Sequence, residues 1–139
     1  MEAKIFKTLP KEAERIRKKV FMEEQGFQNE FDETDRISLH VVLLDVSNPV
    51  GTCRIYYSEE RQCYVIGRIA VLKDHRGRNA GSQLLKAAEK EIRKRKGNRA
   101  ELLAQVRATP FYEKNRYFSL GDIYMDEGCP HVWMRKELR

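Results

Sequence analysis

Apolar residues in the middle of the chain fall into three short runs. The runs at 39–44, 50–57 and 64–71 are rich in β-branched and aromatic residues, and turn-forming segments at 47–49 and 59–62 separate them. Short apolar runs bounded by such turns are typical of strands joined by tight connections. The pattern therefore predicts an antiparallel meander of three strands.

The first forty residues carry a helical pattern. A short strand is expected at 5–7, after which Thr8 is placed to cap a helix that has Pro10 in its first turn. The apolar stripe of this helix would consist of residues at helical spacing, namely Ala13, Ile16 and Val20. Residues 22–37 are polar and acidic without a clean period. They predict a loop with a short helix, lying over or beside a site.

A longer amphipathic helix is predicted from about 78 to 96, with Gly97-Asn98 ending it. Its apolar residues share one face: Leu84, Leu85, Ala88 and Ile92. A strand is then expected at 101–106 and a short helix after it, with Thr109 as cap and Pro110 at the first helical position. A final hairpin would pair the segments 117–124 and 131–136, connected through residues 126–128.

The predicted order β-α-α-β-β-β-α-β-α-β-β indicates an α/β fold, with one mixed sheet and helices on its faces. The 139 residues, 41% apolar and 35% charged, suit a single globular domain spanning 1–139. No run is long enough to span a bilayer, and the N-terminus has no cleavable signal pattern. Cys53, Cys63 and Cys129 are not in metal-ligand spacing. We therefore expect no metal site, reduced thiols and a cytoplasmic location.

Candidate chemistry gathers where the third strand of the meander ends. Residues 76–82 form a basic, glycine-punctuated turn, and the long helix follows directly. Backbone N–H groups of the turn, the unpaired donors of a helix N-terminus and the charges of Arg76 and Arg78 together suit a diphosphate. Gly77 and Gly81 would let phosphate oxygens approach the backbone. The segment matches neither the dinucleotide glycine pattern nor the Lys-Ser/Thr phosphate loop.

The same turn resembles the acetyl-CoA diphosphate loop of the GNAT superfamily of N-acetyltransferases, written Arg/Gln-x-x-Gly-x-Gly/Ala. Arg76, Asn79 and Gly81 fall on this frame, so Asn79 replaces the middle glycine. Asparagine tolerates left-handed backbone better than most residues. Residues 111–117 resemble the family segment Phe-Tyr-Glu-Lys-x-Gly-Phe, with Arg116 at the glycine position.

Two further segments narrow the resemblance. Residues 20–25 (Val-Phe-Met-Glu-Glu-Gln) and 126–134 (Asp-Glu-Gly-Cys-Pro-His-Val-Trp-Met) resemble the ElaA- and YjcF-like branch of small GNAT proteins. The predicted element order is that of the GNAT fold, and the resemblance covers nearly the whole chain. It implies that an acetyl group passes from acetyl-CoA to a primary amine by direct attack in a ternary complex.

The resemblance also implies where acetyl-CoA is held. The strand before the loop would splay from its neighbour, and the pantetheine arm would contact the backbone of Ile69, Ala70 and Val71. The Val71 amide would polarise the thioester carbonyl and hold the oxyanion. The diphosphate would lie on the residues that follow: Arg76, Gly77, Arg78, Asn79, Ala80, Gly81 and Ser82.

Tyr112 is the predicted general acid for the leaving CoA thiolate, because the family often has a tyrosine here near the sulfur. The alternative is that Tyr112 and Phe111 are simply a packed aromatic pair. Many relatives carry a glutamate as base at the position of Arg68, which an arginine cannot replace in that role. Glu24 in the acidic loop is the candidate base by its location, the alternative being a solvated loop carboxylate. His131 near the end of the chain could relay a proton, the alternative being a hydrogen-bonded structural histidine.

The net charge of +6 is concentrated on and after the long helix, between Lys86 and Arg99. It indicates a solvated helix face, supported by possible pairs Glu89–Arg93 and Glu91–Arg95, or attraction of polyanionic coenzyme A, or nucleic-acid binding. No zinc-finger, KH or RNP-type pattern accompanies the charge, which makes nucleic acid the weakest of the three. The acidic residues of the 22–37 loop would attract a cationic amine or form a solvated loop: Glu23, Glu24, Glu30, Asp32, Glu33 and Asp35.

Three function classes follow. The first is an acetyltransferase that acts on a small-molecule or peptide amine, as a monomer or homodimer and without a membrane partner. The second is an acyl-CoA-binding module without efficient turnover, suggested by Asn79, Arg116 and the absent strand glutamate. The third is a basic nucleic-acid-binding protein.

Overall fold

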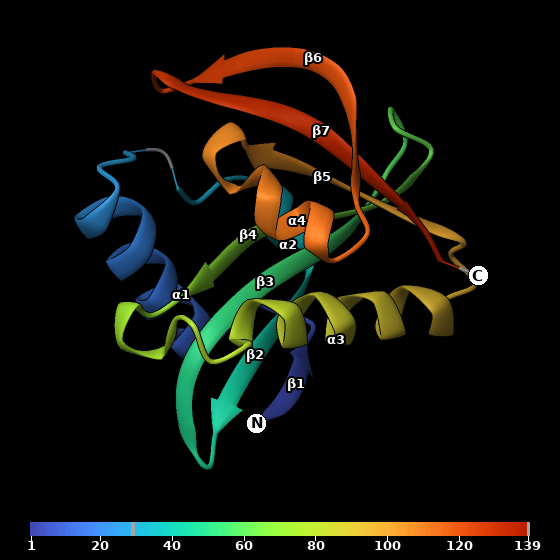
Figure 1. The fold of residues 1–139 in the computed structure, drawn as a ribbon. Coiled ribbons are helices and arrows are strands. Elements are labelled where there is room, and N and C mark those ends of the chain that lie inside the picture. Colours follow the sequence, from blue (N-terminus) through green and yellow to red (C-terminus); the bar gives the residue numbers. More distant parts are fainter. Residues whose placement is uncertain (29, 139) are drawn as a thin grey trace.

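A seven-stranded mixed sheet organises the computed structural model, which describes residues 1–28 and 30–138 (Figure 1). The strand order is β1-β2-β3-β4-β5-β7-β6; β4 and β5 run parallel, and the other neighbours pair antiparallel. The strands are β1 (Glu2–Phe6), β2 (Leu39–Asp45), β3 (Asn48–Ser58), β4 (Cys63–Val71), β5 (Arg99–Gln105), β6 (Phe118–Asp126) and β7 (Cys129–Glu137).

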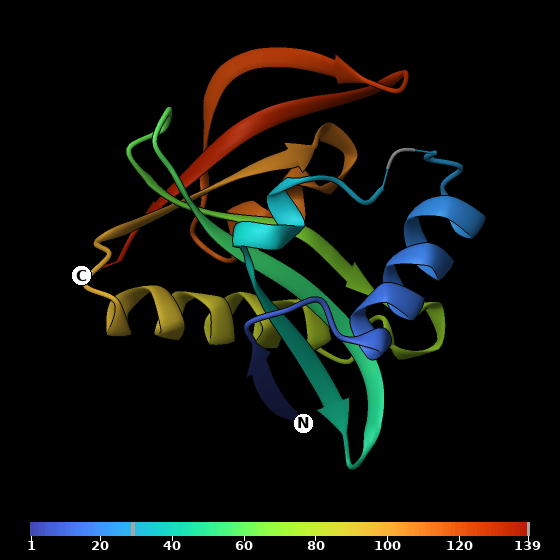
Figure 2. The same cartoon turned by 180° about the vertical axis from the view of Figure 1, so that it is seen from behind.

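Helices cover both faces of the sheet, with α1 and α2 on one side and α3 and α4 on the other (Figures 1 and 2). The helical segments are α1 (Lys11–Arg17), the π-helical η1 (Lys18–Glu24), α2 (Thr34–Ile37), the 3-10 turn η2 (Lys73–His75), α3 (Ala80–Lys94), the 3-10 turn η3 (Val106–Ala108) and α4 (Thr109–Lys114). Within the described residues, no helix is long and apolar enough to cross a membrane.

The core lies mainly between the sheet and α3. The predicted apolar stripe of α3 is fully buried, and it packs against the inward residues of β2 and β3, among them Val41 and Ile55. A smaller cluster on the opposite face joins α1 and η1 to β4: Ile16, Val20, Phe21 and Ala70. Both helical stripes predicted from the sequence are therefore confirmed.

The predicted meander is confirmed as β2, β3 and β4, and the final hairpin as β6 and β7. Two predicted caps are wrong. The helix α1 starts at Lys11 with Pro10, not Thr8, at its N-cap, because the chain stays extended through Pro10. The helix α4 has Ala108 at its N-cap, and Thr109 is already helical, with its hydroxyl donating to the Val106 carbonyl.

The turns that end α3 and α4 each contain a non-glycine residue in the left-handed conformation. Lys96, not Gly97, is left-handed at the end of α3 (φ 70°), whereas a Cβ on Gly97 would lie 2.4 Å from Ile92 Cγ2. Gly97 is therefore needed for space. After α4, Arg116 is left-handed (φ 74°), and the Tyr117 N–H donates to the Tyr112 carbonyl in a Schellman-type end.

The expected surface pair Glu89–Arg93 is also wrong. Glu89 is 3% exposed and accepts hydrogen bonds from the Tyr117 hydroxyl (2.8 Å) and the Lys136 ammonium (2.9 Å). The pair Glu91–Arg95 is present at 2.9 Å. The basic face of α3 thus keeps more uncompensated charge than the sequence suggested.

The central feature for function is the separation of β4 from β5. The two strands pair only at Tyr64↔Ala100 and Val65↔Glu101, near the start of each. Beyond this point a bulge in β4 shifts its register against β3, and Arg68 within the bulge is left-handed at φ 50°. Bulges bend a strand. The sheet therefore opens along the second half of β4, as the family resemblance implied.

Candidate active site

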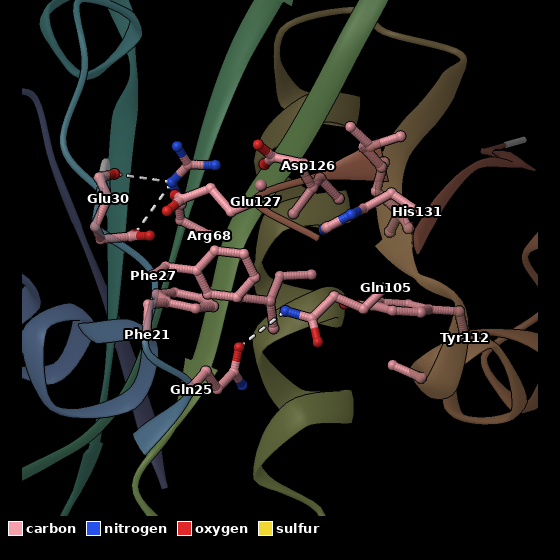
Figure 3. A pocket seen from close by; sticks show the side chains of 16 residues that line it. Phe21, Gln25, Phe27, Glu30, Arg68, Gln105, Tyr112, Asp126, Glu127 and His131 are labelled. Carbon is pink, nitrogen blue, oxygen red and sulfur yellow. Dashed lines mark hydrogen bonds and ion pairs between the residues drawn. The ribbon is translucent and has the colours of Figure 1, made fainter. Parts of the chain in front are cut away.

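A cavity of about 180 Å³ lies at this opening (Figure 3). Figure 3 shows side chains from η1 and the following loop, including Phe21 and Phe27, facing His131 and Tyr112 across it. Arg68 from the bulge of β4 reaches the same space. The cavity thus joins segments that are far apart in the sequence, from the first helical region to the last hairpin.

The turn after β4 presents backbone donors at the N-terminus of α3. Asn79 is left-handed, with φ 66° and ψ 15°, as its residue type suggested. The Gln83 N–H donates to the Asn79 carbonyl, so the N–H groups of Ala80, Gly81 and Ser82 have no acceptor within the helix. In the described chain no side chain caps this end. The arrangement can accept an anion without removing an existing cap.

The two arginines of the turn already have partners. Arg76 donates from Nε to the Val71 carbonyl (2.9 Å) and forms a bidentate ion pair with Glu24, in which one hydrogen bond is 2.9 Å. Arg78 pairs with Asp45 at 3.2 Å. Hydrogen bonds from Arg76 lower the pKa of Glu24. Glu24 is therefore a weaker base than an ordinary glutamate, and it faces the turn that was expected to bind diphosphate.

The absence of a side chain at Gly81 makes room for Phe111, and its predicted role in admitting phosphate stays a prediction. A Cβ at this position would lie 2.8 Å from Cζ of Phe111. The ring of Phe111 therefore rests on the first turn of α3. Gly77 is different, because it is left-handed at φ 80° and has open space around it. The freedom of approach expected of both glycines is available at Gly77.

The backbone of β4 presents one residue in particular to the opening. The Leu72 N–H donates to the Val50 carbonyl at 2.9 Å, and Val71 lies opposite Gly51. Because hydrogen-bonded and non-hydrogen-bonded pairs alternate in an antiparallel ladder, the Val71 N–H and carbonyl point away from β3. Ala70, the next residue in the alternation, directs its main-chain groups at β3. Among the backbone contacts to pantetheine predicted for Ala70 and Val71, only those of Val71 involve main-chain groups that point away from β3.

Tyr112 enters the cavity from α4 (Figure 3). Its ring packs edge-on against Phe111 and Tyr117, with centroids 5.0 and 6.2 Å away. Burial raises the pKa of the Tyr112 phenol, so the hydroxyl keeps its proton at neutral pH. Tyr112 is a packed aromatic residue that also lines the cavity with a protonated phenol, so packing does not exclude the predicted role as acid.

His131 lies in the cavity wall and is only 7% exposed. Its Nδ1 lies 2.9 Å from the Cys129 carbonyl, which can only accept, so this nitrogen carries the proton in the neutral ring. Within the described residues Nε2 has no hydrogen-bond partner, and Figure 3 shows the ring directed into the cavity. His131 can therefore accept a proton there. His40, by contrast, is buried and bonded to the Asp35 carbonyl.

The acidic loop is largely neutralised. A network of ion pairs joins three arginines to three of its carboxylates: Arg17, Arg54 and Arg68 with Glu30, Asp32 and Asp35. Burial alone would raise the pKa of Asp35, but hydrogen bonding and charge from Arg17 outweigh it and lower the pKa to about 2. Burial raises the pKa of Glu30, despite the opposing charge of Arg68. These three carboxylates fix the loop, and their charge is not available to attract an amine.

Several cavity residues were missed by sequence analysis. Gln105 on β5 donates to Gln25 at the end of η1 (2.9 Å), which bridges the two sides of the opening. Phe21 and Phe27 form an edge-on pair and line the same wall. Two signals pointed to this region, the resemblance of residues 20–25 to a family segment and the aperiodic segment 22–37, and neither showed which side chains point inward.

Comparison with known proteins is consistent with this geometry. A family model described as "Acetyltransferase (GNAT) domain" matches residues 7–138. The chain is 35% identical over 130 residues to the uncharacterized N-acetyltransferase YjcF of Bacillus subtilis (strain 168), with 91% of each chain covered. It is 24% identical to Escherichia coli ElaA, with a TM-score of 0.85 over 98% of this chain and 99% of that one. An aminoglycoside 6'-N-acetyltransferase complexed with coenzyme A gives a TM-score of 0.78 at 16% identity, over 100% of this chain and 98% of that one.

Proposed function

The chain belongs to the GNAT acetyltransferase family, and from this premise we propose that it transfers the acetyl group of acetyl-CoA directly to a primary amine. The observation that carries the proposal is the course of β4. Its outward-facing Val71 amide leads straight into the uncapped N-terminus of α3. One continuous segment thus offers a donor for a thioester carbonyl and several donors for a diphosphate.

Each part of this segment has a separate role in the proposal. The N–H groups of Ala80, Gly81 and Ser82, together with Gly77 and the side chain of Arg76, hold the diphosphate. The N–H of Val71 polarises the thioester carbonyl and stabilises the oxyanion that forms there. The neighbour crystallised with coenzyme A has the same fold, which supports placing the cofactor in the opening between β4 and β5.

His131 and Tyr112 supply the proton transfers in the proposal. The amine nitrogen attacks the thioester carbon, and His131 Nε2 accepts the proton that the amine loses. As the carbon–sulfur bond breaks, the Tyr112 hydroxyl protonates the leaving thiolate and recovers its proton from solvent. Glu24 is the weaker candidate for base, because its carboxylate is engaged by Arg76.

Release of free CoA from acetyl-CoA, measured with a panel of primary amines, tests the function. We expect amine-dependent release, and Tyr112→Phe should lower kcat about 100-fold while leaving CoA affinity nearly unchanged. His131→Gln should lower kcat while leaving CoA affinity nearly unchanged. CoA binding without release for any amine would favour the acyl-CoA-binding module, and salt-sensitive DNA binding without a CoA effect would favour the third class.

A further inference from the structure

One arginine in the cavity wall lies at a strained point of the backbone. Arg68 is left-handed at φ 50°, a conformation that glycine adopts freely and other residues adopt at a cost in free energy. The glycine beside it, Gly67, is not left-handed. The chain thus has an arginine where a glycine would cost least. Strain of this kind persists only where the surrounding contacts compensate for it.

The strained residue belongs to the bulge of β4. In the β3–β4 ladder, Cys53 faces two residues of β4, Arg68 and Ile69. An extra residue of this kind bends its strand and re-aims the side chain that it carries. The strands β4 and β5 pair only before the bulge, and residues 66–69 of β4 line the cavity. The conformation of Arg68 is therefore coupled to the opening between the two strands.

The guanidinium of Arg68 supplies contacts that compensate for the strain. Its Nε donates to the Glu30 carbonyl (3.0 Å) and lies 3.1 Å from Glu30 Oε1, and its Nη2 donates to the Asp32 carboxylate (3.2 Å). The side chain is 26% exposed, and Figure 3 shows it with Glu30 across the cavity from His131. These contacts join the bulge of β4 to the segment 30–32.

The segment 30–32 is also anchored independently of β4. Arg17 at the end of α1 binds Glu30 at 2.9 Å, and Arg54 of β3 binds Asp32 at 2.7 Å. Both of these arginines are buried. Glu30 and Asp32 are therefore each shared between Arg68 and one arginine of a packed element. Loss of Arg68 would leave the segment with its other anchors and remove its connection to the bulge.

We propose that Arg68 is a positioning residue for acetyl transfer, whose one guanidinium holds both the bulge of β4 and the segment 30–32 beside the cavity. The inference rests on the proposed acetyltransferase function and adds a residue that shapes both substrate sites. On the cofactor side, the bulge keeps the second half of β4 apart from β5. On the acceptor side, the contacts to Glu30 and Asp32 fix the wall opposite His131. Arg68 thus contributes geometry and takes no proton.

Glycine and alanine at position 68 separate the two effects. Both replacements remove the guanidinium and its contacts to the segment 30–32. Glycine accepts the left-handed conformation at little cost, so the bulge should persist, whereas alanine keeps the strain without the contacts that offset it. We therefore expect the KM for the acceptor to rise about fivefold or more in both variants. The affinity for coenzyme A should fall about fivefold in Arg68→Ala alone.

Calorimetric titration with coenzyme A and steady-state kinetics measure the two effects in the full-length protein. The acceptor is the primary amine of the panel that gives the fastest release of free CoA. In Arg68→Gly, the Kd for coenzyme A should stay within about twofold of the wild type, and kcat should change by less than the KM for the acceptor. Because Arg17 and Arg54 still anchor the segment 30–32, this variant should fold, which its melting temperature checks.

Lys96 provides the matched control, because it is exposed, left-handed at φ 70° and outside the cavity lining. Lys96→Gly and Lys96→Ala should keep the wild-type Kd and KM. A wild-type KM for the acceptor in Arg68→Gly, or equal affinities for coenzyme A in Arg68→Gly and Arg68→Ala, would overturn the inference. Absence of amine-dependent CoA release from the wild type would instead overturn the proposed function, and the titrations with coenzyme A would still test the bulge.

Discussion

Replacing Glu24 with glutamine should increase the affinity for coenzyme A. Three donor atoms of Arg76 are engaged, Nε by the Val71 carbonyl and the two terminal nitrogens by Glu24. A diphosphate that binds Arg76 must displace the Glu24 carboxylate or share the guanidinium with it. The glutamine side chain has a similar size but no charge, so it removes the competing ion pair and the repulsion between carboxylate and phosphate.

The exposure of the pair limits the size of the effect. The Arg76 and Glu24 side chains are 39% and 35% exposed, so solvent screens their attraction. Exposed ion pairs contribute up to about 1 kcal/mol, which corresponds to a gain in affinity of at most about fivefold. We expect Glu24→Gln to lower the Kd for coenzyme A about two- to fivefold at low salt. The gain should decline at high salt as the pair is screened.

Isothermal titration calorimetry with coenzyme A at two salt concentrations measures this difference. Glu23→Gln is the control. Glu23 is exposed, and its replacement removes the same charge while leaving the Glu24–Arg76 ion pair in place. If Glu24→Gln binds coenzyme A more than threefold more weakly than the wild type, Glu24 positions Arg76 for the phosphate. That result would refute competition.

Three further changes test the backbone and the ion-pair network. Asn79→Gly should retain the affinity for coenzyme A, whereas Asn79→Val should destabilise the fold by about 1–2 kcal/mol, because a β-branched residue is strained at φ 66°; denaturant unfolding and titration would show it. Arg116→Gly should stabilise the protein by about 1 kcal/mol by relieving the left-handed conformation, while Arg116→Ala should not; equal melting temperatures would contradict the strain. The lowered pKa of Asp35 means that its ion pairs contribute about 2 kcal/mol above pH 4, and that this contribution is lost as the pH falls toward 2. The difference in unfolding free energy between wild type and Asp35→Asn should therefore narrow over that range.

The fold was predictable from the sequence because its elements carry strong local periodicity. The apolar runs of β2, β3 and β4 are separated by clear turn signals, and Leu84, Leu85, Ala88 and Ile92 mark one face of α3 without ambiguity. The left-handed conformation of Asn79 was predictable for the same local reason. Helix boundaries were less accurate, because a threonine can cap a helix only if the chain turns there, and extended backbone at Pro10 moved the start of α1.

The shape of the cavity was not predictable, since it depends on departures from regular structure. The π-helical η1 continues directly from α1, and it carries Phe21 toward the opening. The bulge at Arg68 rotates β4 away from β5. Gly67 within the strand run is compatible with a bulge, but it does not show which residue bulges or how the strand turns. The packing of Phe111 on Gly81 likewise requires the three-dimensional arrangement of α3 and α4.

The charge available to a ligand could be predicted from the structure but not from the sequence. Composition identified the acidic residues of the 22–37 loop as possible attractors of an amine, but Asp35 and Glu30 are bound by arginines from α1 and the sheet. Asp126 and Glu127 belong to an ordinary turn sequence, yet the turn brings both to the cavity wall, where Glu127 accepts a hydrogen bond from the Gln28 N–H. An acidic residue attracts a ligand only to the extent that its charge is not already compensated. The partners that decide this lie on other strands and helices, so the electrostatics of the acceptor site follow from the tertiary structure.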